Sequence, residues 1–381
     1  MKIAFISNHT IGYHTYKPLI DEAKRRGYEV IFSKDKDIEA DIGIYSDDFC
    51  KRGNQKICIV MPNGIDCDHV DRPNYVSIFE QENWGDFDIG LLPGPRWSLG
   101  WLTAQKQLKK LPKYGVFEVG WPKSDRLFEN GDPAIERLKG KVRRKILYAP
   151  QTEQDGKQDL IVNSLDGKNI DLYIKHWETL EYAPFYPGLI TREYYTELQK
   201  SNERAQKKGE WVFIIDPKSN FMEALNNCDL LITDQSSVLY EAALVGAPTL
   251  TVKGWKHACN IKGGVCKGPQ PSPDIISVCS ESNVYESIED IFQNYKSYVY
   301  QAINVRNDTY VNLGISSMVT LNIIEEALNG GRLPDSLTDM NLTSSRYGWN
   351  KRVITGTNRT RFASPIAYHF KEKLVNHILS I

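Results

Sequence analysis

The alternation of short apolar runs with longer amphipathic segments constrains the fold of this chain most strongly. "KIAFIS" at 2–7 has the continuous apolar character of a buried strand, and "TYKPLIDEAKRRG" at 15–27 carries apolar residues at helical spacing before a terminal glycine. Further strand-like runs follow at 28–33, 40–46, 56–62, 87–94 and 115–122. Strands of this kind that alternate with helices predict a parallel sheet with both faces covered.

A charged, glycine-containing segment at 129–145 interrupts the alternation, which begins again at "KILYAP" (145–150). Further strand-like runs lie at 170–176, 210–216, 228–234, 247–254 and 274–280. With 381 residues the chain is too long for one ordinary core. The sequence therefore predicts an α/β protein of two facing Rossmann-like domains, at 1–130 and 131–330, with a cleft between them. Open α/β sheets bind ligands at the carboxyl ends of their strands, so we expect the site in that cleft.

Residues 331–381 differ from the rest of the chain, because they are polar, turn-rich and basic. We expect them to form a C-terminal basic arm. It either packs back on the N-terminal domain or meets an anionic surface.

Composition and motif content exclude several classes of protein. The formal net charge is −1 and no basic face is concentrated in the sequence, so nucleic acid is not an expected partner. The first apolar stretch is too short for a signal peptide, and no run reaches the ~20 apolar residues of a spanning helix. We therefore expect a cytoplasmic protein. The seven cysteines form no CxxC pair, which favours reduced thiols over a zinc site. Walker, GxGxxG, HExxH and GxSxG motifs are absent from the sequence.

The segment "CDLLITDQSSVLYEAALVGAP" at 228–248 reads as a strand, a turn and a helix. Ser236 or Ser237 is placed to cap this helix, whose first turn leaves backbone N–H groups unpaired and carries partial positive charge. A phosphate fits such a position. Glu241 follows one turn later, where a carboxylate can accept hydrogen bonds from ribose hydroxyls. The alternative is a plain helix capped by Asp234, without a ligand.

The order and spacing of five segments resemble the CDP-glycerol glycerophosphotransferase family. Gly120, Pro122 and Asp125 match its G-x-P-x-x-D motif, and Lys175-His176 stand for its K-x-HP motif in shortened form. The resemblance extends over roughly residues 55–328. The segments are "VFEVGWPKSDRL" (116–127), "KILYAPQT" (145–152), "YIKHW" (173–177), "ITDQSSVLYEAALVGAPTL" (232–250) and "NLGISSMVTLNIIEEAL" (312–328).

This resemblance implies the GT-B arrangement of two Rossmann-like domains and a role in teichoic-acid-type polymer synthesis. An acceptor hydroxyl would attack the β-phosphorus of a CDP-activated alcohol, and CMP would leave. Ser236 and Ser237 would hold the pyrophosphate and Glu241 the ribose, while His176 would lie near the phosphates as a catalytic candidate. Lys175 either contributes to this site or is mainly structural. The implied donor- or nucleotide-binding residues are Thr152, Lys175, Asp234, Ser236, Ser237 and Glu241.

One departure from the family pattern concerns the catalytic base. The family has a His-Gly pair after a first-domain strand, where this chain has Asn63-Gly64, and asparagine does not accept a proton at useful pH. The base must then lie elsewhere, or the reaction differs. A histidine or carboxylate in a nearby loop is the replacement we expect, or else these residues bind acceptor or solvent. The catalytic candidates besides His176 are His14, His9 and Asp66, and the acceptor-side candidates are Asn63, Gly64 and His69.

Three functions remain open on the sequence alone. The first is a transferase that moves a phospho-alcohol from a CDP-linked donor, or a sugar from a UDP-linked donor, to a polymer or lipid-linked acceptor at the inner face of the membrane. The second is an isomerase of the UDP-sugar 2-epimerase kind. The third is a nucleotide-binding protein without catalysis. DxD triplets occur at 35–37, 66–68 and 86–88, but two α/β units favour a metal-independent enzyme without a cofactor.

The tryptophans of the first domain allow two interpretations. Trp84, Trp97, Trp101 and Trp121 form either the floor of an acceptor-sugar site or part of the core. We expect at least two of them in the core.

Overall fold

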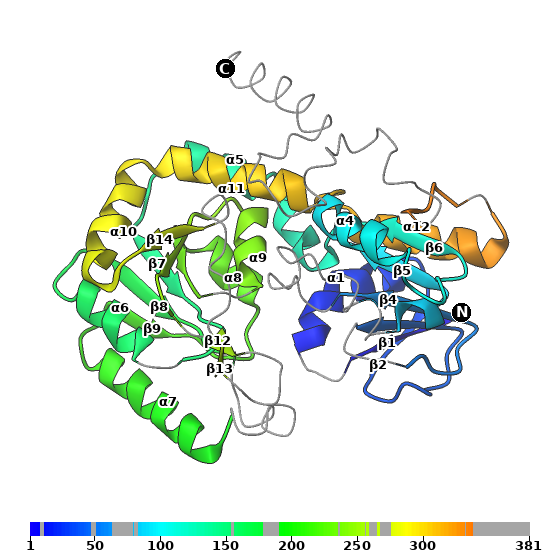
Figure 1. Cartoon of the computed structure of the whole chain (residues 1–381), viewed down its shortest axis with the longest axis horizontal. Coiled ribbons are helices and arrows are strands. Elements are labelled where there is room, and N and C mark those ends of the chain that lie inside the picture. Colours follow the sequence, from blue (N-terminus) through cyan, green and yellow to red (C-terminus); the bar gives the residue numbers. More distant parts are fainter. Residues whose placement is uncertain are drawn as a thin grey trace, which may run out of the picture. The chain divides into compact units, whose positions relative to one another are not determined.

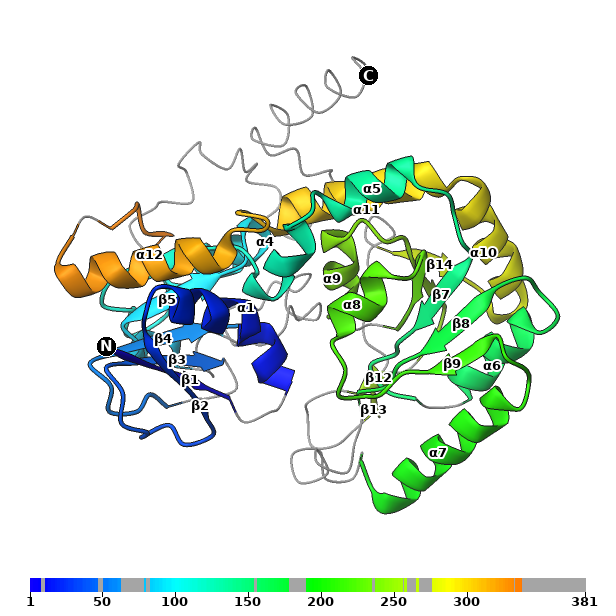
Figure 2. The ribbon, with the colours of Figure 1, turned by 180° about the vertical axis from the view of Figure 1, so that it is seen from behind.

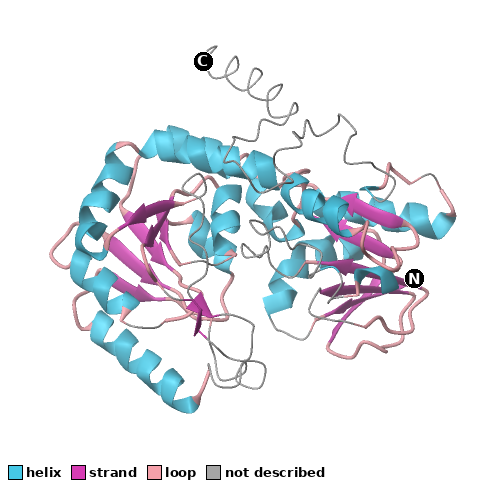
Figure 3. Ribbon diagram, viewed as in Figure 1, coloured by secondary structure: helices cyan, strands magenta, loops and turns pink. Residues whose placement is uncertain are grey.

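The computed structural model describes residues 1–7, 11–46, 51–62, 79, 83–153, 156–177, 190–234, 237–255, 257–258, 265–266, 276–331 and 333–337. The chain divides into two compact units. The first contains the described residues of 1–64 and 69–129 and those from 307 onward, and the second contains those of 130–306. Figure 3 shows that each unit combines strands with helices. Each unit is described by itself below.

The first unit is built on a six-stranded sheet in the order β2-β1-β3-β4-β5-β6, in which all neighbouring strands run parallel. The inner strands β3, β4 and β5 are buried at every position, as their apolar runs predict. The strands are β1 (Lys2–Ile6), β2 (Glu29–Ser33), β3 (Ile42–Ser46), β4 (Ile57–Met61), β5 (Ile89–Leu92) and β6 (Gly115–Glu118). Its helical elements are α1 (Ile11–Arg25), η1 (Trp84–Asp86), α4 (Pro95–Ala104), η2 (Pro122–Phe128) and α12 (Ser316–Asn329).

The second unit has another six-stranded parallel sheet, in the order β14-β11-β10-β7-β8-β9 (Figure 1). Its strands are β7 (Lys145–Tyr148), β8 (Asp171–Ile174), β9 (Val212–Ile214), β10 (Leu230–Ile232), β11 (Thr249–Val252) and β14 (Ser277–Cys279). β12 (His257–Ala258) pairs antiparallel with β13 (Val265–Cys266). The helical elements are α5 (Pro133–Lys139), α6 (Lys157–Leu165), α7 (Arg192–Gln206), α8 (Phe221–Asn226), α9 (Val238–Leu244), η4 (Glu281–Asn283), α10 (Val284–Gln293) and α11 (Tyr295–Thr309).

Helices cover both faces of the second sheet. Figures 1 and 2 show α6, α7 and α10 on one side of it and α8 and α9 on the other. The buried cluster on the first side joins apolar residues of α6, α10 and α11 to alternate residues of the strands, such as Ile146, Leu172 and Leu230. Two parallel sheets covered by helices confirm the predicted α/β class.

The family motif at Gly120, Pro122 and Asp125 has a structural role, because it fastens α12 within the first unit. The two carboxylate oxygens of Asp125 accept hydrogen bonds from the backbone N–H groups of Ser316 (3.0 Å) and Ser317 (2.7 Å). These are N–H groups that the start of a helix leaves unpaired. Gly120 has φ of +92°, and a Cβ there would lie 2.3 Å from Ser316 Oγ, so no larger residue fits.

The boundary of the second unit differs from the predicted domain limit at 330. The division falls inside α11, after Arg306, and α12 packs on α1 in the first unit. An ion pair between Arg26 and Glu325 (2.9 Å) supports this packing. Of the predicted arm at 331–381, residues 331 and 333–337 are described. Ser336 of this part donates to Val116 in β6, and its oxygen accepts from the Val116 N–H at 3.0 Å.

The tryptophans of the first unit belong to its core. Trp84, Trp97, Trp101 and Trp121 are all at most 3% exposed. Trp84 and Trp101 also pack around the ring of Phe79. The prediction of core packing is therefore confirmed, and the alternative of an exposed acceptor-sugar floor made by these four rings is wrong.

Candidate functional site

The order of strands in the second sheet identifies the edge where a ligand is expected. From β7 the chain adds β8 and β9 on one side, and it then returns to add β10, β11 and β14 on the other. The direction therefore reverses between the neighbouring strands β7 and β10. In open parallel sheets the ligand binds at such a switch point, beyond the carboxyl ends of the strands. The residues that follow Tyr148 and Ile232 line this edge.

Asp234, which follows β10, is fully buried and joined to the loop after β7. Its Oδ1 accepts a hydrogen bond from the backbone N–H of Gln151 (2.7 Å), and its Oδ2 lies 2.7 Å from Lys157 Nζ. The side chains of Asp234 and Lys157 are each 1% exposed. The preceding residue, Thr233, donates its hydroxyl to the carbonyl of Ala149 at 2.7 Å. These contacts make Asp234 a residue that holds two loops together.

Lys175 also has a structural environment. Its ammonium donates to the carbonyls of Asp216 (2.8 Å) and Pro217 (2.9 Å) and to the hydroxyl of Ser219 (3.2 Å). These contacts use the three N–H groups of a lysine and fix the turn after β9. Of the two readings left open by the sequence, the structure favours the structural one for Lys175.

His176, at the carboxyl end of β8, is buried and hydrogen-bonded inside the unit. Its Nε2 lies 2.7 Å from Gln158 Oε1 on α6, so the ring donates its proton to that oxygen. Burial lowers the pKa of His176 to about 3, and the ring is therefore neutral at neutral pH. A neutral ring does not supply positive charge to a leaving phosphate. The catalytic role of His176 stays a prediction.

Buried polar atoms without a described partner gather at the same edge. Among the described residues, Gln151 Oε1, Thr152 Oγ1 and Gln158 Nε2 have no hydrogen-bond partner. Thr152 and Gln158 are both 0% exposed. A buried polar group without a partner costs about 1–3 kcal/mol, so such groups are retained where a ligand or water uses them. The donor-binding role of Thr152 stays a prediction.

Glu153 is a residue of this loop that the sequence reading missed. Its carboxylate accepts hydrogen bonds from the Tyr148 hydroxyl (2.6 Å) and from the backbone N–H of Gln158 (3.0 Å). Burial raises the pKa of Glu153 to about 7. Perturbed carboxyl groups are frequent in functional sites, although structural networks also contain them. The segment "TEQDGKQ" has the polarity of an ordinary loop, so nothing in the sequence indicates that Glu153 and Lys157 are buried in a candidate site.

The helix after β10, α9, is short. α9 begins at Val238 and ends at Leu244. Ser237 precedes it in the right-handed helical conformation and makes no capping hydrogen bond with its side chain, so the expected cap at Ser237 is wrong. Asp234, the alternative cap, directs its carboxylate to Gln151 and Lys157. Glu241 lies in the first turn of α9 and is 3% exposed. The proposed contacts of Ser237 and Glu241 with a nucleotide stay predictions.

The acceptor-side and base candidates lie mostly outside the described residues. His14 is described, and it lies within α1 rather than in a loop, because the helix begins at Ile11. Its side chain is half-buried beside the ring of Tyr13. The candidates outside the described residues are His9, Asn63, Gly64, Asp66, His69 and Ser236.

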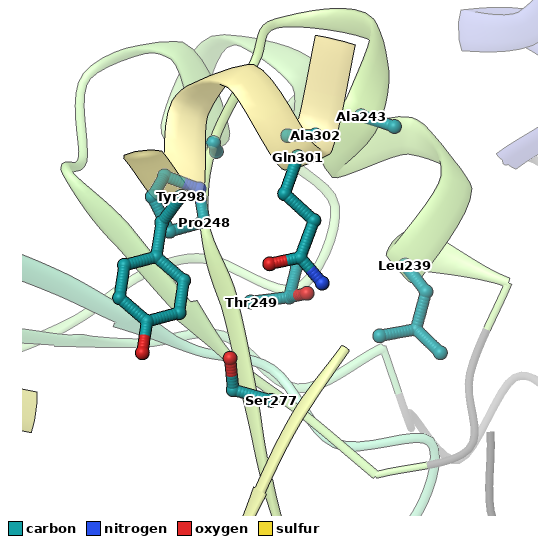
Figure 4. A pocket seen from close by; sticks show the side chains of 9 residues that line it. Leu239, Ala243, Pro248, Thr249, Ser277, Tyr298, Gln301 and Ala302 are labelled. Carbon is teal, nitrogen blue, oxygen red and sulfur yellow. The ribbon is translucent and has the colours of Figure 1, made fainter. Parts of the chain in front are cut away.

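A small pocket in the second unit lies at a different place (Figure 4). It has a volume of about 10 Å³, which is the room that one water molecule needs. Its lining includes Thr249 and Ser277, the first residues of β11 and β14, and Tyr298 and Gln301 of α11. The pocket is therefore at the amino ends of these strands, opposite the switch-point edge, and it is too small for a nucleotide.

The described part of the chain contains no group of three or more histidine, cysteine, aspartate or glutamate side chains that are arranged to hold a metal ion. In the triplet at 86–88, Asp86 pairs with Lys110 (3.0 Å) and Asp88 with Arg52 (3.1 Å). Metal independence stays a prediction. None of the described helices is long and apolar enough to cross a bilayer.

Comparison with protein families provides the deciding observation. A model of the family described as CDP-Glycerol:Poly(glycerophosphate) glycerophosphotransferase matches residues 108–253. The predicted resemblance to the glycerophosphotransferases is confirmed. The matched segment runs from just before β6 to β11, so it contains both loops of the switch point. The family consists of transferases, as predicted for this chain. No curated protein sequence matches the chain.

Solved structures with the same fold include the wall teichoic acid polymerase TagF. It is 16% identical, with 86% of this chain and 89% of that chain covered and a TM-score of 0.55. A TagF variant soaked with CDPG is also 16% identical at the same coverage, with a TM-score of 0.57. The S. aureus MnaA–UDP co-structure is 12% identical, with 88% of this chain and 99% of that chain covered and a TM-score of 0.55. At these identities the likeness shows the fold, which is GT-B as predicted. The cleft between the domains stays a prediction.

Proposed function

We propose that this chain transfers a glycerol-phosphate-like group from a CDP-linked donor to a cell-surface polymer or glycan acceptor. The observation that carries the proposal is the family match over residues 108–253, which contains the switch point of the second sheet. The buried polar atoms of Gln151 and Thr152 at this edge support a ligand there.

The proposed reaction is a displacement at phosphorus. An acceptor hydroxyl attacks the β-phosphorus of the donor, the bond from that phosphorus to the bridging oxygen breaks, and CMP leaves with the electron pair. The hydroxyl proton passes to a base. The residues proposed for the base are His9, His14 and Asp66, and the proposed diphosphate ligands are Ser236 and Ser237. Neutral hydroxyl donors of this kind stabilise charge that develops on a phosphate.

The proposal assigns different roles to the other predicted residues. Thr152 contacts the donor with its hydroxyl, and Glu241 accepts hydrogen bonds from the ribose. Asp234 and Lys175 hold the loops in place, because their side chains form hydrogen bonds with other protein groups at 2.7–3.2 Å. We further propose that the enzyme is cytoplasmic, needs no metal ion, and meets a lipid-linked acceptor at the inner face of the membrane.

The alternative donor is a nucleotide sugar. The fold likeness to the S. aureus MnaA–UDP co-structure favours keeping this alternative, because that structure is one with UDP. The two donors differ in their products, so one experiment separates them. The same experiment also separates a transferase from an isomerase, since an isomerase acts on a nucleotide sugar without any acceptor.

The test is a product assay with purified full-length protein and a glycerol-phosphate-primed lipid acceptor. CDP-glycerol is expected to release CMP only when the acceptor is present. UDP-N-acetylglucosamine is expected to give neither UDP release nor conversion to an epimer. Release of UDP with acceptor, or epimer formed from the UDP-sugar alone, would replace the proposal by the corresponding alternative. Binding of CDP without turnover of either donor would favour a binding protein.

A further inference from the structure

Lys157 lies at the centre of the switch-point edge of the second unit. It is the first residue of α6 and follows Gly156, whose φ is +76°. Its ammonium donates to the carbonyl of Thr152 at 2.9 Å and to Asp234 Oδ2 at 2.7 Å. The same ammonium lies 5.6 Å from the ring centre of Trp255, which follows β11. The Lys157 side chain thus contacts residues that follow three different strands of the sheet, β7, β10 and β11.

The contacts of Lys157 with Asp234 and Thr152 fix the loop after β7. Asp234 Oδ1 accepts from the Gln151 N–H at 2.7 Å, and its other oxygen faces Lys157. Lys157 in turn holds the carbonyl of Thr152. Two successive residues of the loop are therefore tied to one buried ion pair, which is 1% exposed on both sides. The loop cannot shift without leaving a buried charge or a buried N–H group unpaired.

Stability alone does not explain this arrangement. A buried ion pair loses the hydration of both charges, and well-packed apolar residues often stabilise the same place equally or better. The loop that the pair holds also buries Gln151 Oε1 and Thr152 Oγ1 without a partner among the described residues. The buried ion pair and the buried polar atoms without a described partner are both unfavourable, and both lie on one loop. Because this loop is at the edge where such sheets bind ligands, we infer that its conformation serves binding.

We propose that Lys157 is a positioning residue for the donor. Through Asp234 and the carbonyl of Thr152 it holds residues 151–153 in the conformation in which the Thr152 hydroxyl and the Gln151 side-chain oxygen contact the bound nucleotide. This inference rests on the proposed function. It assigns Asp234 to the same positioning pair, which we call the Lys157–Asp234 clamp, and it makes Thr152 the residue through which the clamp acts on the ligand.

The test uses the double variant Lys157→Met/Asp234→Asn, which removes both charges together. The asparagine oxygen can still accept from the Gln151 N–H, so the variant is expected to fold. Its Kd for CDP, measured by isothermal titration calorimetry, is expected to rise at least tenfold. In the product assay KM for the donor is expected to rise by a similar factor while kcat changes less than threefold. The matched control is Lys208→Met/Asp166→Asn, which removes an exposed pair of the same type and is expected to leave Kd and KM unchanged.

The substitution Thr152→Val tests whether the clamp acts on the ligand through the Thr152 hydroxyl. This substitution is expected to weaken CDP binding about tenfold in the parent protein. Added to the double variant it is expected to cause less than a twofold further loss, since the hydroxyl is then already displaced. Equal losses in both backgrounds would show that Thr152 acts independently of the clamp and would overturn the proposal.

Hydrogen exchange at the backbone amides of 151–153 gives a readout that needs no nucleotide. The proposal predicts faster exchange at these amides in the folded double variant and unchanged exchange in the control pair. A double variant that folds, keeps slow exchange at 151–153 and binds CDP as tightly as the parent would overturn it. If the parent protein bound neither CDP nor UDP, the proposed function would be wrong. Faster exchange in the double variant would in that case still show that the clamp fixes the loop.

Discussion

Replacing Lys157 alone by methionine is expected to lower the free energy of unfolding by about 3–5 kcal/mol, because it leaves the carboxylate of Asp234 buried without its partner. Both side chains are 1% exposed, so water does not replace the lost ammonium. The substitution also removes the donor to the Thr152 carbonyl at 2.9 Å. Urea denaturation of the full chain, followed by circular dichroism, measures the change.

A matched surface lysine separates the effect of burial from the effect of charge. Lys208 pairs with Asp166 at 3.0 Å, and their side chains are 40% and 45% exposed. Lys208→Met is expected to cost less than about 1 kcal/mol, as exposed pairs usually do. Asp234→Asn added to Lys157→Met is expected to recover part of the lost stability. Similar losses for Lys157→Met and Lys208→Met would contradict the buried pair described here.

Arg137→Met is expected to destabilise the protein by about 2–4 kcal/mol, since hydrogen bonds from a charged donor contribute more than neutral ones. The guanidinium, on α5, donates to the carbonyls of Leu225 (2.9 Å), Asn226 (3.2 Å) and Val245 (2.8 Å). It also donates to the carbonyl of Cys228. These carbonyls belong to the last residues of α8 or to residues just after α8 and α9, so Arg137 fixes the ends of the helices that flank β10. Urea denaturation again gives the measurement.

Two control variants define what this arginine contributes. Arg143→Met removes an exposed arginine of the same unit and is expected to change stability by less than about 0.5 kcal/mol. Arg137→Lys keeps the charge but lacks the planar fork that reaches several carbonyls at once, so an intermediate loss is expected. A lysine variant as stable as the parent would show that charge near these carbonyls suffices.

The α/β architecture could be predicted because it depends on local patterns. Apolar runs such as 57–61 and 230–232 are short, nearly continuous and separated by helical segments, and both became inner parallel strands. The start of α1 at Ile11 was missed, because "IGYHTY" contains a glycine, which disfavours a helix. His14 therefore lies in a helix that the sequence predicts to begin only at residue 15.

The long-range contacts were less accessible from the sequence. The pattern of α12 is that of any amphipathic helix, and its place in the first unit depends on Asp125, which is 191 residues from Ser316. The family motif around Asp125 was recognised, but its meaning as a helix cap needs the three-dimensional structure.

The edge at which we place the candidate site follows from the sequence, but the sequence indicates only part of the residues that line it. The turn after β10 was identified from its sequence, and Thr152 from its resemblance to the family. Lys157 was not, because a lysine after a glycine in a polar loop is usually exposed, and nothing local indicates that Asp234 pairs with it 77 positions away. Sequence patterns predict such charged residues poorly, because their burial depends on a partner that is distant in the chain.

A crystal structure of the full chain with CDP tests the central claim most directly. The account predicts the nucleotide at the carboxyl ends of β7 and β10, with the Thr152 hydroxyl within hydrogen-bond distance and with the Lys157–Asp234 clamp intact beside it. CDP bound at another edge of the second sheet, or bound only to the first unit, would contradict it.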